Sequence, residues 1–169
     1  MTVAQASPKP AISRVDFVHH SPELLAKAME LGAAIKKCAI EQTTLDLVTM
    51  RASQINGCAF CLDMHVKEAK LHGERELRLY HVPIWRESNL FTPRERAALE
   101  WTEVLTKLPA HGVPDDIYQS VRRELSEKEI SDLSFVIGMI NSWNRLNIGF
   151  RTVPGSADAA LGLDKAGLS

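Results

Sequence analysis

Large charge imbalances and long apolar runs are both missing from this sequence. It contains 20 Lys and Arg residues against 21 Asp and Glu residues, with no basic block. A near-neutral chain has no strong field to attract polyanions, so we expect neither nucleic acid nor an anionic membrane as a partner. No run of about 18 apolar residues occurs, so we also expect no membrane-spanning segment.

A secretory signal and a cysteine framework are missing as well. The first residues, MTVAQASPKPAIS, lack the basic region and apolar run of a signal peptide, so we expect a cytoplasmic protein. Three cysteines in 169 residues do not make a disulfide framework. In a reducing compartment, a close Cys pair is more often catalytic or metal-binding.

The alternating pattern of β-strands is also lacking, because the apolar spacing is helical nearly throughout. With 45% hydrophobic residues, a chain of this length can fill one core. We therefore predict a single all-α domain over residues 1–169, a compact bundle of about six or seven helices. It divides into an N-terminal arm (1–20), a helical core (21–150) and a C-terminal tail (151–169). The tail after Pro154 is rich in Gly, Ala and Asp, which predicts a loose segment or one docked on a neighbour.

Capping signals mark the ends of the predicted helices. Thr92-Pro93-Arg94-Glu95 and Ser126-Glu127-Lys128-Glu129 both have the pattern of a capping box. A first helix begins at Ser21-Pro22-Glu23, where Pro suits the first helical position. The following predicted helices cover about 44–55, 59–71, 74–81, 92–108, a short stretch from 114, and 126–147.

The stretch QINGCAFCLDMH, residues 54–65, gathers two cysteines and a histidine on one helix face. Cys58 and Cys61 are three residues apart and His65 follows four residues later. Gly57 can end one helix, which leaves Cys58 at the start of the next. Unpaired amides and the positive end of the helix dipole stabilise a thiolate there, and an imidazole beside Cys61 can take its proton.

Four interpretations fit such a stretch: a redox-active thiol pair, a zinc site, a haem attachment site and a structural disulfide. Haem attachment needs His directly after the second Cys, and Leu62 stands there. The histidine at helical spacing favours redox chemistry, but zinc and a packing role stay open. The zinc alternative would use Cys58, Cys61 and His65, with Asp46 or His72 as the fourth ligand.

The segment LDLVTMRASQINGCAFCLDMH resembles the core motif of the alkylhydroperoxidase D family, within the carboxymuconolactone decarboxylase superfamily. That motif is an acidic residue, eleven intervening residues, and then C-x-x-C-x-x-x-H. The similarity extends over about residues 15–154 through FVHHSPELLAKAME, LHGERELRLYHVPIWRES, FTPRERAALEWTEVLT and ISDLSFVIGMINSWNRLNIGFR. It implies an all-α fold, homo-oligomers such as trimers or hexamers, and antioxidant peroxidase activity without haem, flavin or metal.

The resemblance also implies roles for four residues. Cys61 corresponds to the peroxidatic cysteine, Cys58 to the resolving one, His65 to the base and proton relay, and Asp46 to the acidic position. The substrate would be an organic hydroperoxide or hydrogen peroxide. A dithiol reductant protein, lipoyl-bearing or thioredoxin-like, would reopen the resulting disulfide.

Two positions depart from the family pattern. Asp46 stands where Glu is usual, and the shorter side chain favours a water-bridged contact with His65 over a direct one. Phe60 stands where the best-understood branch has His. The alternative is therefore a thiol-disulfide oxidoreductase or redox-sensing protein with weak or no peroxidase turnover.

Excess apolar surface gives a second reason to expect an oligomer. The predicted helix around Ile130 to Ile148 is apolar on more than one face, and the helix from Ala97 to Leu108 has a wide apolar face with Trp101. A helix that is apolar all round must be buried on all sides. Two such helices carry more apolar surface than one small core can bury, which predicts a subunit interface.

Overall fold

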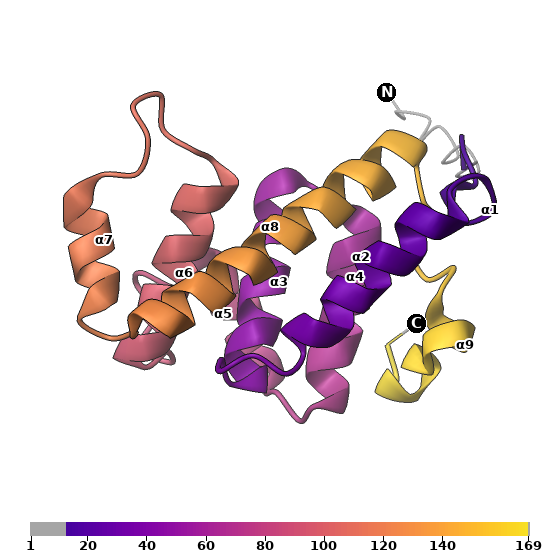
Figure 1. The fold of residues 1–169 in the computed structure, drawn as a ribbon. Coiled ribbons are helices and arrows are strands. Elements are labelled where there is room, and N and C mark those ends of the chain that lie inside the picture. Colours follow the sequence, from indigo (N-terminus) through magenta and orange to yellow (C-terminus); the bar gives the residue numbers. More distant parts are fainter. Residues whose placement is uncertain (1–12, 169) are drawn as a thin grey trace, which may run out of the picture.

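A computed structural model describes residues 13–168 of the chain. The predicted all-α class is confirmed, because these residues form helices and no strand (Figure 1). The helix count exceeds the predicted six or seven because α1 and α9 are single turns of four residues, too short to show a periodic pattern. The elements are α1 (Phe17–His20), α2 (Pro22–Ile35), α3 (Gln42–Asn56), α4 (Ala59–Leu71), α5 (Glu76–His81), η1 (Val82–Ile84), α6 (Pro93–Thr106), α7 (Asp115–Arg122), α8 (Glu127–Phe150), α9 (Asp158–Leu161) and η2 (Leu163–Ala166).

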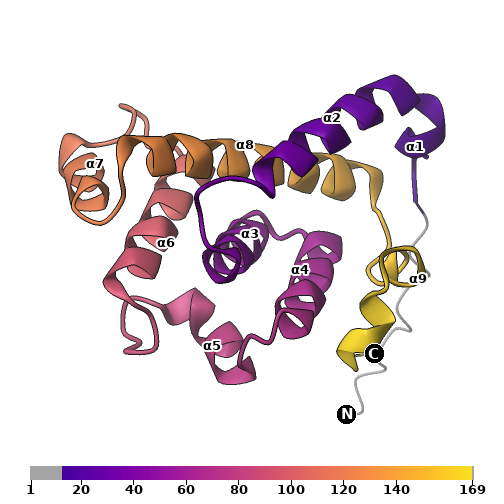
Figure 2. The ribbon, with the colours of Figure 1, turned by 60° about the horizontal axis from the view of Figure 1, so that its bottom comes forward.

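Helix α3 lies at the centre of the molecule. Figure 2 shows α4, α5, α6 and α8 arranged around it, and α2 running along α8. Leu47, Val48 and Ala52 of α3 are fully buried. Because these side chains are buried, the C-terminal end of α3 lies inside the bundle, and so does the start of α4.

Helices α6 and α8 begin with the capping boxes that the sequence predicts. The Thr92 hydroxyl accepts a hydrogen bond from the Glu95 N–H at 3.2 Å, and the Glu95 carboxylate reaches back to the Thr92 N–H. Ser126 and Glu129 form the same reciprocal pair at the start of α8. Both predicted capping boxes are therefore confirmed.

The C-terminal segment differs from the loose or neighbour-docked tail that its composition predicts. It packs on α4 of the same chain, where the buried ammonium of Lys67 lies 2.6 Å from an Asp158 oxygen and 2.8 Å from an Asp63 oxygen. The N–H of Gly155 donates to Asp63 at 3.0 Å, and Leu163 is buried. A buried ammonium needs opposite charges, and the tail supplies one of them.

Among the described helices, none is both long and apolar enough to cross a membrane.

Candidate active site at the start of helix α4

Cys58 and Cys61 lie at the junction between α3 and α4. Gly57 ends α3 in the left-handed conformation, with a φ of 70°, which glycine adopts without strain. Cys58 then caps α4, since its Sγ accepts a hydrogen bond from the backbone N–H of Cys61 at 3.3 Å. A disulfide joins the two cysteines, whose Cα atoms are 5.4 Å apart. The predicted close approach of the two thiols is therefore present.

The two sulfurs are enclosed by apolar side chains from three helices. Cys58 is 1% exposed and Cys61 is 2% exposed. They cluster with Ala52 of α3 and Ile140 of α8, and Phe60 and Trp143 pack against this cluster. A reagent must therefore pass an apolar wall to reach either sulfur.

His65 lies one turn after Cys61 on α4, as its spacing predicts, and its partner is Glu68. Its Nδ1 is 2.7 Å from Oε2 of Glu68. Burial opposes the ionisation of Glu68, but the hydrogen bond with His65 and nearby positive charges hold the pKa of Glu68 below its ordinary value. An ionised carboxylate only accepts hydrogen bonds, so the His65 Nδ1 that faces Glu68 carries a proton, and Nε2 has no hydrogen-bond partner among the described residues.

Asp46 is buried in α3 but does not join His65. Its two oxygens bond to the Gln42 side chain at 2.9 Å and to Nδ1 of His72 at 2.8 Å, and no hydrogen bond links it to His65 in the described part of the chain. Burial raises the pKa of Asp46, although the hydrogen bonds with Gln42 and His72 act against this increase. Asp46 therefore makes no direct hydrogen bond to His65, as its short side chain predicts, and the acid that bonds to His65 directly is Glu68 of α4. The water-bridged relay from Asp46 stays a prediction.

Two residues of the site were not identified from the sequence. Glu68 could have been found, because it is three residues after His65 on the same helix and such pairs are neighbours. Asn147 of α8 could not, because its Nδ2 comes within 3.6 Å of Cys61 Sγ only through the packing of α8 on α4. No local spacing predicts that contact.

The candidate zinc ligands are divided between separate interactions. Cys58 and Cys61 are joined to each other, and Asp46 bonds to His72. Over residues 13–168, no group of three or more His, Cys, Asp or Glu side chains is arranged to hold a metal ion.

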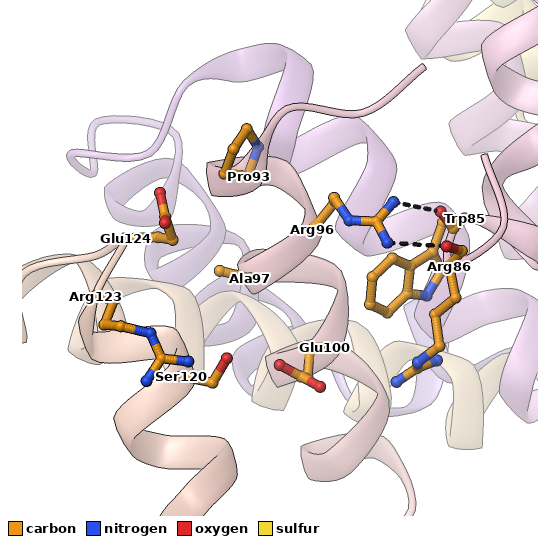
Figure 3. A pocket seen from close by; sticks show the side chains of 9 residues that line it. All are labelled: Trp85, Arg86, Pro93, Arg96, Ala97, Glu100, Ser120, Arg123 and Glu124. Carbon is orange, nitrogen blue, oxygen red and sulfur yellow. Dashed lines mark hydrogen bonds between the residues drawn. The ribbon is translucent and has the colours of Figure 1, made fainter. Parts of the chain in front are cut away.

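An open groove lies elsewhere on the molecule, between α6, α7 and the loop after η1 (Figure 3). In that groove the guanidinium of Arg96 donates to the backbone carbonyls of Trp85 and Arg86. Arg86 also stacks on the Trp85 ring and pairs with Glu103. These groups satisfy one another, and the groove shares no lining residue with the cysteine site.

The sequence of this chain is similar to those of known proteins. A family model described as the carboxymuconolactone decarboxylase family matches residues 22–104. The chain is similar to the uncharacterized protein YdfG of Bacillus subtilis, with 42% identity over 135 residues that cover 80% of this chain and 92% of YdfG.

Solved structures share the fold. A protein of unknown function from Agrobacterium tumefaciens, ATU0492, described as a candidate antioxidant defence protein AhpD, superposes with a TM-score of 0.81 at 39% identity. The match covers 85% of this chain and 98% of ATU0492. The debrominase Bmp8 superposes with a TM-score of 0.75 at 21% identity over 88% of this chain and 80% of its own, which shows a common fold.

Proposed function

This chain belongs to the alkylhydroperoxidase D-like group of the carboxymuconolactone decarboxylase family, and from that premise we propose that it is a thiol-dependent peroxidase. It would reduce organic hydroperoxides or hydrogen peroxide through the Cys58 and Cys61 pair. The observation that supports this most is the joined cysteine pair at the start of α4, with the free Nε2 of His65 on the same face.

The proposed cycle begins with proton transfer from the Cys61 thiol to Nε2 of His65. The Cys61 thiolate attacks the terminal oxygen of the hydroperoxide, the O–O bond breaks, and the leaving alkoxide takes a proton to become an alcohol. Cys61 is then a sulfenic acid, oxidised by two electrons. The thiol of Cys58 condenses with it, which forms the disulfide and releases water.

A dithiol must return the pair to the reduced state. One of its thiolates attacks the disulfide, and its second thiol displaces the protein sulfur by exchange. The net reaction converts one hydroperoxide and one dithiol into an alcohol, water and one disulfide. We propose a lipoyl-bearing or thioredoxin-like protein as this dithiol, in the cytoplasm, where such reductants keep thiols reduced.

We also propose that the chain works as a homo-oligomer, a trimer or a hexamer. Helix α2 has no buried residue, and its Leu24 and Met29 are exposed. Phe135 and Ile148 of the neighbouring α8 are exposed as well. A second subunit would cover this apolar surface. Light scattering at micromolar concentration should give a mass above that of one chain, and a stable monomer would contradict the proposal.

The test of the peroxidase proposal is a thiol count on reduced protein before and after one equivalent of cumene hydroperoxide. We expect rapid loss of two of the three thiols, and recovery of both on addition of dithiothreitol. Cys61→Ser should lose none rapidly, whereas Cys38→Ser, which changes a free cysteine outside the pair, should behave like the parent chain. Oxidation no faster than that of a simple thiol would contradict peroxidase activity, and stoichiometric zinc in the purified protein would contradict the thiol cycle itself.

The burial of the two sulfurs also supports a second function. Because Cys58 and Cys61 are nearly inaccessible and Phe60 stands beside them, a thiol-disulfide oxidoreductase or redox sensor would also suit the site. Steady-state assays with hydroperoxide and excess dithiothreitol separate the two functions. Hydroperoxide consumption much faster than that by dithiothreitol alone indicates a peroxidase, and consumption at the rate of dithiothreitol alone indicates a sensor or oxidoreductase.

A further inference from the structure

Two buried side-chain polar atoms in the described residues have no hydrogen-bond partner. One belongs to Asn147, whose amide nitrogen approaches Cys61 Sγ, and the other to His65, one helical turn after Cys61 on α4. They are Nε2 of His65 and Oδ1 of Asn147. Buried polar groups are almost always paired, so an unpaired one needs an explanation such as a ligand or a catalytic role. Here two of them come from different helices, α4 and α8.

Asn147 reaches this position from the last turns of α8. Its Nδ2 donates to the Trp143 carbonyl at 2.9 Å and approaches Cys61 Sγ at 3.6 Å. The Trp143 oxygen can only accept, so the amide nitrogen must face it and the amide oxygen must be the free end. Asn147 is 5% exposed, so that oxygen is held inside the protein.

The other buried asparagines of α8 show what a purely structural role looks like. Asn144 accepts from the Asn56 amide and donates to the Ser53 hydroxyl. Asn141 accepts from Asn56 and donates to the Thr106 hydroxyl. Both amides are used at nitrogen and at oxygen. Asn147 differs because its nitrogen faces the reactive sulfur and its oxygen is unpaired.

We propose that Asn147 is a catalytic residue that holds the Cys61 sulfur through its N–H group and receives the hydroperoxide O–H through its oxygen. This proposal rests on the peroxidase function proposed above. Once the Cys61 proton has moved to His65, Nε2 is a donor from α4 and Asn147 Oδ1 is an acceptor from α8. A hydroperoxide end, –O–O–H, needs one acceptor for its O–H and one donor for its leaving oxygen.

The reaction balances through these two groups. The terminal O–H donates to Asn147 Oδ1 while Cys61 Sγ attacks that same oxygen. The O–O bond breaks, and the departing oxygen takes the proton from Nε2 of His65 to become an alcohol. Asn147 gains and loses nothing, and His65 returns to its neutral form with the proton on Nδ1. Asn147 therefore orients the substrate for an attack in line with the O–O bond.

The test uses Asn147→Leu, which keeps the shape of the side chain but removes both polar atoms. The matched control is Asn141→Leu on the same helix, because Asn141 is also buried and its side chain is hydrogen-bonded to Asn56, Thr106 and Arg145. In the Cys58→Ser background, two rates are measured at Cys61: oxidation by hydrogen peroxide and alkylation by iodoacetamide, which has no peroxide bond. Asn147→Ser serves as a smaller second variant if the Leu protein does not fold.

We expect Asn147→Leu to slow oxidation by about tenfold to a hundredfold, because a positioned hydrogen bond to the reacting groups is lost. The midpoint of the pH dependence of the alkylation rate should move up by about one pH unit, because the Cys61 thiolate loses a hydrogen-bond donor. Asn141→Leu should lower thermal stability but leave both rates within about twofold.

Equal oxidation rates and equal alkylation profiles in the parent and in Asn147→Leu would overturn the role of Asn147 alone. The same holds if Asn141→Leu slows oxidation as much as Asn147→Leu does. A parent protein that does not react with hydrogen peroxide would overturn the proposed function and the substrate-binding role together. The alkylation profile needs no peroxide, so it separates these two failures.

Discussion

Replacing Glu68 with Gln tests whether the acid on His65 controls the oxidation of Cys61. The hydrogen bond between Glu68 Oε2 and His65 Nδ1 is 2.7 Å long, and hydrogen bonds to charged groups contribute about 1.5–3 kcal/mol. The Glu68 side chain is 30% exposed, so solvent screens part of this interaction and about 1.4 kcal/mol is a reasonable effective value. That free energy corresponds to roughly tenfold slower oxidation of Cys61 in Glu68→Gln.

The matching variant Asp46→Asn should change the same rate by about twofold or less. Asp46 bonds to Gln42 and His72, and no hydrogen bond joins it to His65 in the described part of the chain, so this change removes no contact of the imidazole. The control Glu76→Gln removes an exposed acid that pairs with Lys70, and it should leave the rate unchanged.

The assay is a single-turnover reaction of reduced protein with excess hydroperoxide at pH 7, quenched with an alkylating reagent at timed intervals. The remaining Cys61 thiol is then counted by peptide mass spectrometry, and circular dichroism checks that each variant is folded. If Asp46→Asn slows oxidation more than Glu68→Gln does, the proton relay runs through Asp46, and Glu68 is not the acid that controls Cys61.

Three further outcomes test the stability of the fold. Lys67→Met should lower the melting temperature and speed proteolysis of the C-terminal segment, because the Asp158 carboxylate loses its buried partner; limited trypsin digestion followed by mass spectrometry checks this. The hydrogen bond from Arg94 is the main cause that lowers the pKa of Glu129 to about 2, so this carboxylate adds stability above pH 4.5 that is lost as the pH falls toward 2. In urea unfolding, the free energy of unfolding of Glu129→Gln should therefore be lower than that of the parent at pH 6 and equal to it near pH 2. Leu47→Ala should cost about 2–5 kcal/mol in urea unfolding, because Leu47 is fully buried in α3, and a loss under about 1 kcal/mol would contradict its place in the core.

The parts of the fold that depend on neighbouring residues were predictable from the sequence. The two capping boxes and the span of α4 follow from signals within a few residues, and all three appear as predicted. The placement of Cys58, Cys61 and His65 on one face also follows from helical spacing alone. The docking of the C-terminal segment was not predictable, because its contacts depend on Lys67, which lies 91 residues before Asp158.

In the candidate active site too, contacts within one helix are predictable from the sequence, and contacts between helices are not. Glu68 is predictable from helical spacing, because it lies three residues after His65 on the same helix. The family motif instead indicates Asp46 in the preceding helix. Asp46 bonds to His72 because the packing of α3 against α4 brings its carboxylate to the far end of α4. Asn147 depends on the angle at which α8 crosses α4, and no spacing in one chain segment encodes that angle.

The sulfur of Cys58 has a consequence for the choice of reference proteins. This one atom both caps α4 and takes part in the disulfide. Serine at this position keeps an acceptor for the Cys61 N–H, whereas alanine leaves that amide without one and costs about 0.5–2 kcal/mol of helix stability. A comparison of Cys58→Ser with Cys58→Ala therefore separates the loss of redox chemistry from the loss of a helix end, and an alanine scan alone would confound them.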